Sequence, residues 1–230
     1  MSIIGKYFIL GSLLTIVVAS TATYANNSMQ LSSENWYVTA SGGWAYIQDE
    51  SVGYTSSLFH DGGGETTGFQ TWGWNVGLSV GKKMDIFRPE FQISYLNNNI
   101  NNIHNESWEG SQNAIWYGVN GFYDIPINNN LFSYIGAGLG GLTATTDYNG
   151  FAGIDTPYIQ PESHTSTVVS YQMIFGLGYQ IMPSIRLSME YRRLASMTRL
   201  TVLKTSGSTA TTGKAYYNNN LFNLAVSYLF

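Results

Sequence analysis

The residues best suited to chemistry are five charged side chains that recur at alternate positions in two short segments. Arg88 and Glu90 stand two apart in one segment, and Arg186, Glu190 and Arg192 stand four and then two apart in the other. Residues two apart on a β-strand share one face, so opposite charges can pair locally, or across to another strand. A buried charge without a partner is very costly. We therefore predict a polar network. It also includes Gln92, Asn120, Asp124 and Gln172.

Three roles are open to such a network: a structural plug, a gated ion path, or a selective substrate site. The interior of an eight-stranded barrel is just wide enough for side chains to fill it. If these residues point into a barrel of that size, the plug is the role that follows most directly. The ion path and the substrate site require space that the plug would occupy.

One short segment could support catalysis. Glu162, His164 and Ser166 place a His-x-Ser pair next to a carboxylate, and such a set can activate a nucleophile. Its layout resembles that of outer-membrane lipid A deacylases, with His164 and Ser166 on one strand face. The segment is rich in Ser and Thr, however, and pairs of this kind arise readily there by chance. We expect no enzyme activity and assign no catalytic residues.

Metal ions, cofactors and nucleic acid find little support. His60, His104 and His164 fall in predicted loops, far apart in sequence, and the chain has no cysteine to ligate zinc or iron–sulfur clusters. The glycines of residues 136–140 lack the following helix that a phosphate-binding loop needs. A net charge of −4 argues against nucleic-acid binding. We expect no metal, no cofactor and no nucleic-acid partner.

The network is positioned by segments in which apolar and polar residues alternate, as they do on a strand with two different faces. In residues 72–80, for example, Trp72, Trp74 and Val76 oppose Gly73 and Asn75. The eight alternating segments are residues 36–44, 72–80, 87–95, 115–124, 134–140, 169–180, 185–192 and 222–230.

Composition decides which way these strands face. Charged residues make up 10% of the chain and aromatic residues 15%, against about 25% charged in typical soluble domains. A soluble lipocalin-like barrel, the main alternative, turns its apolar face inward. Here the apolar faces are too large and too rich in aromatic rings to leave in water, which favours a membrane barrel with its apolar face outward.

The connections alternate in length. Short ones are predicted at residues 82–85, 126–130 and 182–184, and long ones at residues 48–69, 97–112, 146–166 and 195–214. Short periplasmic turns with long external loops are typical of outer-membrane barrels. The predicted fold is all-β: an eight-stranded antiparallel transmembrane β-barrel with short periplasmic turns and long extracellular loops. Its glycines should make room for large inward side chains: Gly42, Gly43, Gly73, Gly77, Gly136, Gly138 and Gly140.

The N-terminus is typical of a secretory signal. Lys6 is its only charge, residues 7–19 are apolar, and small residues precede Ala25 at spacing that suits signal peptidase. We predict a signal peptide over residues 1–25, with cleavage after Ala25 or, alternatively, Ala22. Residues 26–230 then form the barrel.

Several stretches resemble known bacterial proteins. The last strand is similar to the β-signal that hands barrels to the insertion machinery, through Phe222, Leu224, Val226, Tyr228 and Phe230. Residues 88–95, 120–124, 134–140 and 171–192 resemble the rickettsial-type surface antigen, or major surface protein, family, within the OmpA- and Opa-like eight-stranded barrels. The resemblance implies an immunogenic surface protein, sometimes a host-cell adhesin, sometimes a weak pore.

The predicted function is accordingly that of a surface antigen, or an adhesin, in the Gram-negative outer membrane, with a filled polar lumen and with loops that contact host or environment. A narrow porin or ion channel is the first alternative, and a lipid-modifying enzyme is the second. The expected partners are outer-membrane lipid, the insertion machinery through the C-terminal strand, and a host-surface protein through the loops.

Overall fold

The computed structural model describes residues 34–47, 52–56, 65–66, 71–103, 106–149, 163–204 and 211–230. The predicted signal peptide, His60, His104 and Glu162 lie outside these residues.

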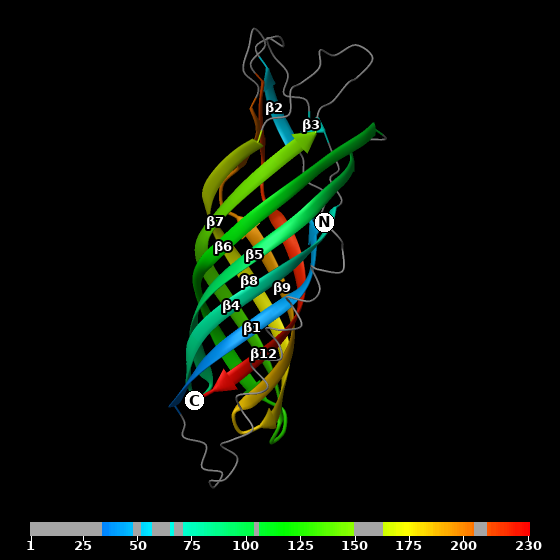
Figure 1. Ribbon diagram of the computed structural model, residues 1–230. Coiled ribbons are helices and arrows are strands. Elements are labelled where there is room, and N and C mark those ends of the chain that lie inside the picture. The colour runs from blue at the N-terminus through cyan, green and yellow to red at the C-terminus, as the bar shows by residue number, and fades with distance from the viewer. Residues whose placement is uncertain are drawn as a thin grey trace. The chain divides into compact units, whose positions relative to one another are not determined.

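A closed antiparallel barrel forms the body of the protein, in the order β1-β12-β9-β8-β7-β6-β5-β4, with β1 hydrogen-bonded to both β4 and β12 (Figure 1). The eight strands predicted from alternation are confirmed. Their bounds are β1 (Glu34–Ile47), β4 (Thr71–Met84), β5 (Phe87–Ile103), β6 (Glu106–Pro126), β7 (Leu131–Asn149), β8 (Ser163–Met182), β9 (Ile185–Ser196) and β12 (Asn218–Leu229). In the described part of the chain, no helix has the length and hydropathy that a membrane crossing needs.

The register staggers the strands strongly. A row of paired residues that starts at Phe175 on β8 returns to β8 at Thr165, ten residues away, after one circuit of the barrel. The residues between are Tyr191, Phe222, Trp44, Trp74, Asn97, Asn113 and Thr145. Stagger and tilt are linked in a closed barrel, and a typical tilt is about 35–45° from the axis. The strongly slanted strands of Figure 1 show this geometry.

Short turns join the strands at one end of the barrel, which we call the turn end. Between β4 and β5 the turn contains Asp85, whose φ of 55° is one that Asp tolerates better than most residues. Between β6 and β7, the side-chain oxygen Oδ1 of Asn128 accepts hydrogen bonds from the backbone N–H groups of Asn130 and Leu131, at 3.0 and 2.8 Å. Pro183 and Ser184 form the third turn, between β8 and β9. The three predicted short connections are confirmed.

The opposite end, which we call the loop end, contains more strand than the sequence predicted. The connection expected at residues 97–112 is mostly strand, because β5 and β6 run to Ile103 and from Glu106. The connection expected at residues 146–166 is shorter for the same reason, because β7 runs to Asn149 and β8 begins at Ser163. Neutral Asn, Ser and Thr side chains continue the pairing there, a pattern that hydrophobic alternation does not detect.

A second sheet occupies the other two long connections. Its strands are β2 (Val52–Ser56), β3 (Glu65–Thr66), β10 (Leu200–Lys204) and β11 (Thr211–Ala215). Their order, β10-β11-β2-β3, repeats the order β9-β12-β1-β4 of the barrel strands that they continue. We call this the external sheet. In Figure 1, β2 is visible at the loop end of the barrel.

The outward face of the barrel is apolar. On β6 its exposed residues run from Ile115 to Ile125, about 33 Å along the strand and therefore about 25 Å along the axis of a tilted barrel, which matches the lipid-facing band of outer-membrane barrels. Trp44 and Trp72, each 65% exposed, lie near the edge of this band that faces the loop end, and Trp36 lies near the edge that faces the turn end. Such a surface needs lipid around it.

Candidate functional site

The barrel lumen contains every member of the polar network. Two pairs of neighbouring strands, β5 with β6 and β8 with β9, supply them, and in each case the strand pleat turns the side chain inward. All nine are buried: Arg88, Glu90, Gln92, Asn120, Asp124, Gln172, Arg186, Glu190 and Arg192. The structure thus brings together residues up to a hundred positions apart in sequence.

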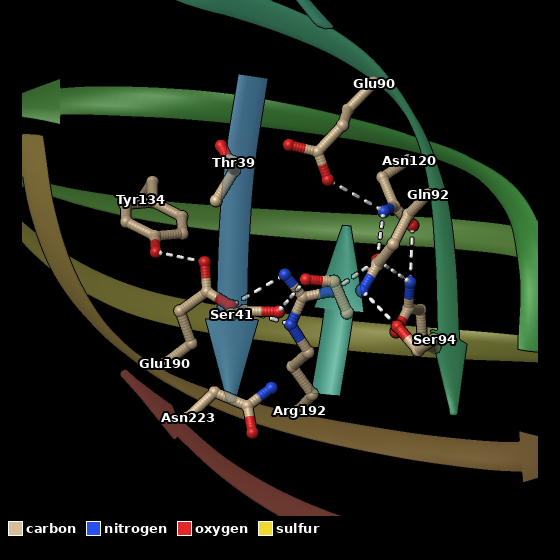
Figure 2. Close-up of polar contacts among 12 residues, drawn as sticks. Thr39, Ser41, Glu90, Gln92, Ser94, Asn120, Tyr134, Glu190, Arg192 and Asn223 are labelled. Carbon is tan, nitrogen blue, oxygen red and sulfur yellow. Dashed lines mark hydrogen bonds and ion pairs between the residues drawn. The ribbon is translucent and has the colours of Figure 1, made fainter. Parts of the chain in front are cut away.

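Arg192 is the hub of a central layer. Its Nη2 lies 2.6 Å from Oε2 of Glu190, and its Nε donates to the same oxygen at 2.7 Å. On the other side, Nη1 of Arg192 donates to Oε1 of Gln92. The hydroxyl of Tyr134 donates to Oε1 of Glu190 at 2.6 Å, so both carboxylate oxygens of Glu190 are occupied (Figure 2).

Amides extend this layer across the lumen. The side-chain Nε2 of Gln172 donates to Oδ1 of Asn120 at 2.6 Å, and Nδ2 of Asn120 donates to Oε1 of Gln92 at 2.8 Å. Glu90 accepts from Asn120 at 3.3 Å and from the hydroxyl of Tyr37 at 3.1 Å. The central layer therefore ties β1, β5, β6, β7, β8 and β9 together, and part of it is shown in Figure 2.

A second layer lies nearer the turn end. Arg88 donates from Nε to Oδ1 of Asp124 at 2.8 Å, and Nη1 of Arg186 lies 3.9 Å from the other oxygen of the same carboxylate. Arg186 also donates from Nε to Oε1 of Gln180 at 2.6 Å. The guanidinium of Arg88 is surrounded by aromatic rings, with centroids 4.8–5.5 Å away, those of Tyr37, Phe122 and Tyr134.

The two layers balance each other electrically. The turn-end layer holds two arginines and one carboxylate, whereas the central layer holds two carboxylates and one arginine. Between them lies a cavity of about 10 Å³, lined by residues of both layers including Arg88, Arg186, Glu90 and Glu190. This is about the space that a single water needs. The cavity between the two layers is thus large enough for one water molecule.

An apolar cluster closes the lumen beyond the central layer. Leu96 and Leu194 continue the inward faces of β5 and β9 past Gln92 and Arg192, and both are almost fully buried. The cluster consists of Ala45, Ile47, Leu96, Ala114, Trp116, Leu142, Ala144, Leu194, Leu200, Ala215, Tyr217 and Leu221. Leu200 and Ala215 come from β10 and β11, so the external sheet packs into the same core.

Sequence reasoning missed this cluster, although a signal was present. Alternation fails near the loop end, where neighbouring residues such as Tyr95-Leu96 and Ala114-Ile115 are both apolar. A strand that is apolar on both faces has a buried inner face as well as a lipid-facing outer one. Those doublets predict an inner core at that level.

Most of the predicted packing glycines lie where a side chain would not fit. A Cβ on Gly138 would stand 2.0 Å from Oδ1 of Asn120, and one on Gly136 would stand 2.6 Å from the ring of Phe122. Gly42 is a correction. A Cβ there would meet no atom closer than 3.5 Å, because the position belongs to the outward face of β1.

His164 and Ser166 are the second correction. The histidine was expected in a loop but lies within β8. Both residues share the inward face of β8, in phase with the buried Ser170 and Gln172, so their side chains point away from the lipid. In the part of the chain that the structure describes, no group of three His, Cys, Asp or Glu residues is arranged to hold a metal ion.

The residues of the predicted assembly signal lie along β12 and just after it. Phe222, Leu224 and Phe230 are exposed on the outward face, with Val226 and Tyr228 partly covered between them. The backbone N–H of Phe230 donates to the carbonyl of Trp36 at 2.9 Å. This stripe therefore lies at the seam where β12 meets β1 and closes the barrel.

Comparison with known proteins agrees with this architecture. A family model described as "Outer membrane protein beta-barrel domain" matches residues 11–230. Among curated proteins, none matches the chain in sequence. Solved structures with a similar fold include Neisserial surface protein A, 20% identical, with a TM-score of 0.51, covering 85% of this chain and 97% of that one.

Two further structures share the fold at lower identity. The outer membrane protein OprG from Pseudomonas aeruginosa is 13% identical, with a TM-score of 0.53, and the match covers 87% of this chain and 98% of OprG. The outer membrane protease OmpT from Escherichia coli is 8% identical, with a TM-score of 0.50, over 89% of this chain and 99% of OmpT. At these identities the likeness concerns the fold alone.

Proposed function

We propose that this chain, which belongs to the outer membrane protein beta-barrel domain family, is a surface protein that acts through its loop end and not as a pore. The protein resides in the outer membrane, with its apolar band in lipid. The finer role that we propose is the one its strand motifs imply, a surface antigen of the rickettsial-type kind that can serve as an adhesin.

The observation that carries the proposal is the packing of the lumen. Two charged layers and an apolar cluster follow one another along the axis, and the cavity between the charged layers has a volume of only about 10 Å³. To conduct ions, the barrel would have to separate Arg192 from Glu190 and also hydrate the apolar cluster. Breaking a buried ion pair costs several kcal/mol, and most side chains of the apolar cluster are hydrocarbon and cannot form hydrogen bonds with water.

The external sheet supports a role at the surface. It is anchored in the lumen through Leu200 and Ala215, so the external sheet itself is a fixed extension of the barrel core. Connections held on a rigid scaffold are where binding residues concentrate. The partner that we propose is a protein of the host surface or of its matrix.

The test is binding by the mature chain folded in phospholipid vesicles. We propose to shorten residues 57–64 and 205–210, the connections within the external sheet, and to measure retention on cultured host cells and on purified matrix proteins. The control shortens residues 127–130 at the turn end. Binding that falls only with the first pair, while both variants keep the heat-dependent gel shift of a folded barrel, supports adhesion. Equal binding by all three proteins contradicts it.

We propose further that the chain is not an enzyme. His164 and Ser166 face inward, where a membrane lipid does not reach them. Lipid A from cells that express wild-type protein or Ser166→Ala should give identical mass spectra, and a difference in acyl-chain content would reverse this part of the proposal.

The insertion machinery is the remaining partner that we propose. The outward stripe of β12, ending at Phe230, lies at the closing seam, so a factor that holds this stripe could keep the last strand available until β1 pairs with it. Removing an open edge is a requirement for any barrel in lipid.

A further inference from the structure

One row of paired residues on the outer surface changes from aromatic to polar side chains as it approaches the loop end. It begins with the aromatic residues Trp44 and Trp74 on β1 and β4, then passes to Asn97 on β5 and Asn113 on β6. It ends with Thr145 and Thr165 on β7 and β8. Because the register is staggered, such a row moves toward the loop end as it passes around the barrel, and on β5–β8 it has left the lipid-facing band.

A compact set of neutral polar side chains forms this upper surface, which we call the polar face: Asn97, Asn113, Thr143, Thr145, Thr165 and Thr167. They are linked in pairs across the strands. The hydroxyls of Thr143 and Thr167 lie 2.9 Å apart, and those of Thr145 and Thr165 lie 2.8 Å apart. Oδ1 of Asn113 accepts a hydrogen bond from Nδ2 of Asn97. The face is thus rigid, with donors and acceptors at strand spacing, about 4.8 Å across and 7 Å along.

The polar face is continuous with the surface that lies in lipid. On three of its four strands, the next outward residue toward the turn end is apolar or aromatic. These residues are Tyr95, Ile115 and Val169, and all three are exposed. Tyr95 joins the two surfaces, because its ring belongs to the apolar band while its hydroxyl donates to Oδ1 of Asn113 at 2.9 Å. The polar face therefore stands at the level of the lipid headgroups.

Its chemistry distinguishes between headgroups. A phosphate is held by a cation or by a cluster of charge-assisted hydrogen bonds, and none of the six side chains is charged. Asp147, two residues beyond Thr145 on the same face, would repel a phosphate. The hydroxyls of a saccharide, by contrast, exchange hydrogen bonds with neutral amides and hydroxyls, and a tyrosine ring provides a flat apolar neighbour.

We infer that the polar face is a docking surface for the saccharide headgroups of glycolipids in the outer leaflet. Bound glycolipid holds the β5–β8 side of the barrel at a fixed depth in the outer leaflet. The aromatic edge of β1 and β4 contacts ordinary lipid instead.

The test uses a variant in which four hydroxyls are removed while the β-branched shape is kept: Thr143→Val, Thr145→Val, Thr165→Val and Thr167→Val together. Wild type and variant are folded in vesicles of phosphatidylcholine alone, with digalactosyl diacylglycerol, or with phosphatidylglycerol. The quantity measured is the temperature at which the barrel loses its folded migration on a gel. We expect the neutral glycolipid to raise this temperature for wild type by about 2–4 °C, the shift that a net hydrogen bond gives a chain of this length.

The variant should lose most of that rise, and phosphatidylglycerol should give neither protein a comparable one. Asn220→Val, on β12 across the barrel from β6, is the matched control and should keep the full rise. If the fourfold variant does not fold in phosphatidylcholine, Asn113→Ala takes its place. An undiminished rise in the variant, or an equal rise with phosphatidylglycerol, overturns the inference. So does an equal rise from free digalactose, which would assign the face to soluble sugar.

Discussion

Replacing Arg192 with methionine should be among the most damaging single changes in the lumen. Arg192 is 2% exposed, and its guanidinium holds Glu190 through two short contacts, of 2.6 and 2.7 Å. Methionine keeps the unbranched stem but leaves the Glu190 carboxylate buried, with the Tyr134 hydroxyl as its one remaining side-chain donor among the residues that the structure describes. Removing one partner of a buried ion pair costs about 3–5 kcal/mol. That is a large part of a typical unfolding free energy of about 5–15 kcal/mol.

Urea unfolding in phospholipid vesicles, followed by tryptophan fluorescence, measures this loss. The double variant Glu190→Gln with Arg192→Met is the matched control, because it removes both charges and should recover most of the stability. The recovery matters more than the single loss, since it separates an unpaired charge from lost packing. A loss below about 1 kcal/mol for Arg192→Met would refute the reasoning, because that is the scale of a solvated pair and would mean that water already fills the lumen.

Four other changes test separate parts of the structure. Gly138→Ala should destabilise the barrel by about 1–3 kcal/mol in the same unfolding assay, since its Cβ would stand 2.0 Å from an amide oxygen. The matched Gly42→Ala should be nearly neutral, and equal effects of the two substitutions would contradict the inward packing. Deleting Phe230 should sharply slow the appearance of folded barrel in cells. It should lower equilibrium stability by only about 1 kcal/mol, because one backbone hydrogen bond is lost. Normal assembly in pulse-labelled cells would argue against a role of Phe230 in assembly. Asp85→Ala should cost about 1–2 kcal/mol at φ 55°, while Asp85→Gly should not; the two are compared by urea midpoint. Arg186→Met should cost less than Arg192→Met, because Arg88 still holds the carboxylate that Arg186 approaches only to 3.9 Å; the reverse order would count against the two-layer description.

The directions of the side chains could be predicted because they follow from the strand pleat alone. Once residues 87–95 are a strand with Phe91 outward, Arg88 and Glu90 must point inward whatever surrounds them. Their partners could not be predicted in this way. Glu190 does pair with Arg192 two residues away, but Arg88 pairs with Asp124 on the neighbouring strand and Glu90 with neutral donors. That choice depends on the register and stagger, which the sequence does not reveal.

The loop end was the harder part for a physical reason. Threonine and asparagine side chains pair across β5–β8 without any apolar alternation, so residues 97–112 had the composition of a loop. The external sheet is similar, with strands of two to five residues whose stability comes from packing on the barrel core. Local composition does not report such long-range support.

The central claim is that the lumen is closed, and single-channel recording across a planar bilayer tests it most directly. Purified barrel, shown by its gel shift to be folded and inserted, should give no stable conductance steps at neutral pH and moderate salt. Regular steps that scale with the amount of inserted protein would contradict the account, because ions would then be passing both the Arg192–Glu190 pair and the apolar cluster above it.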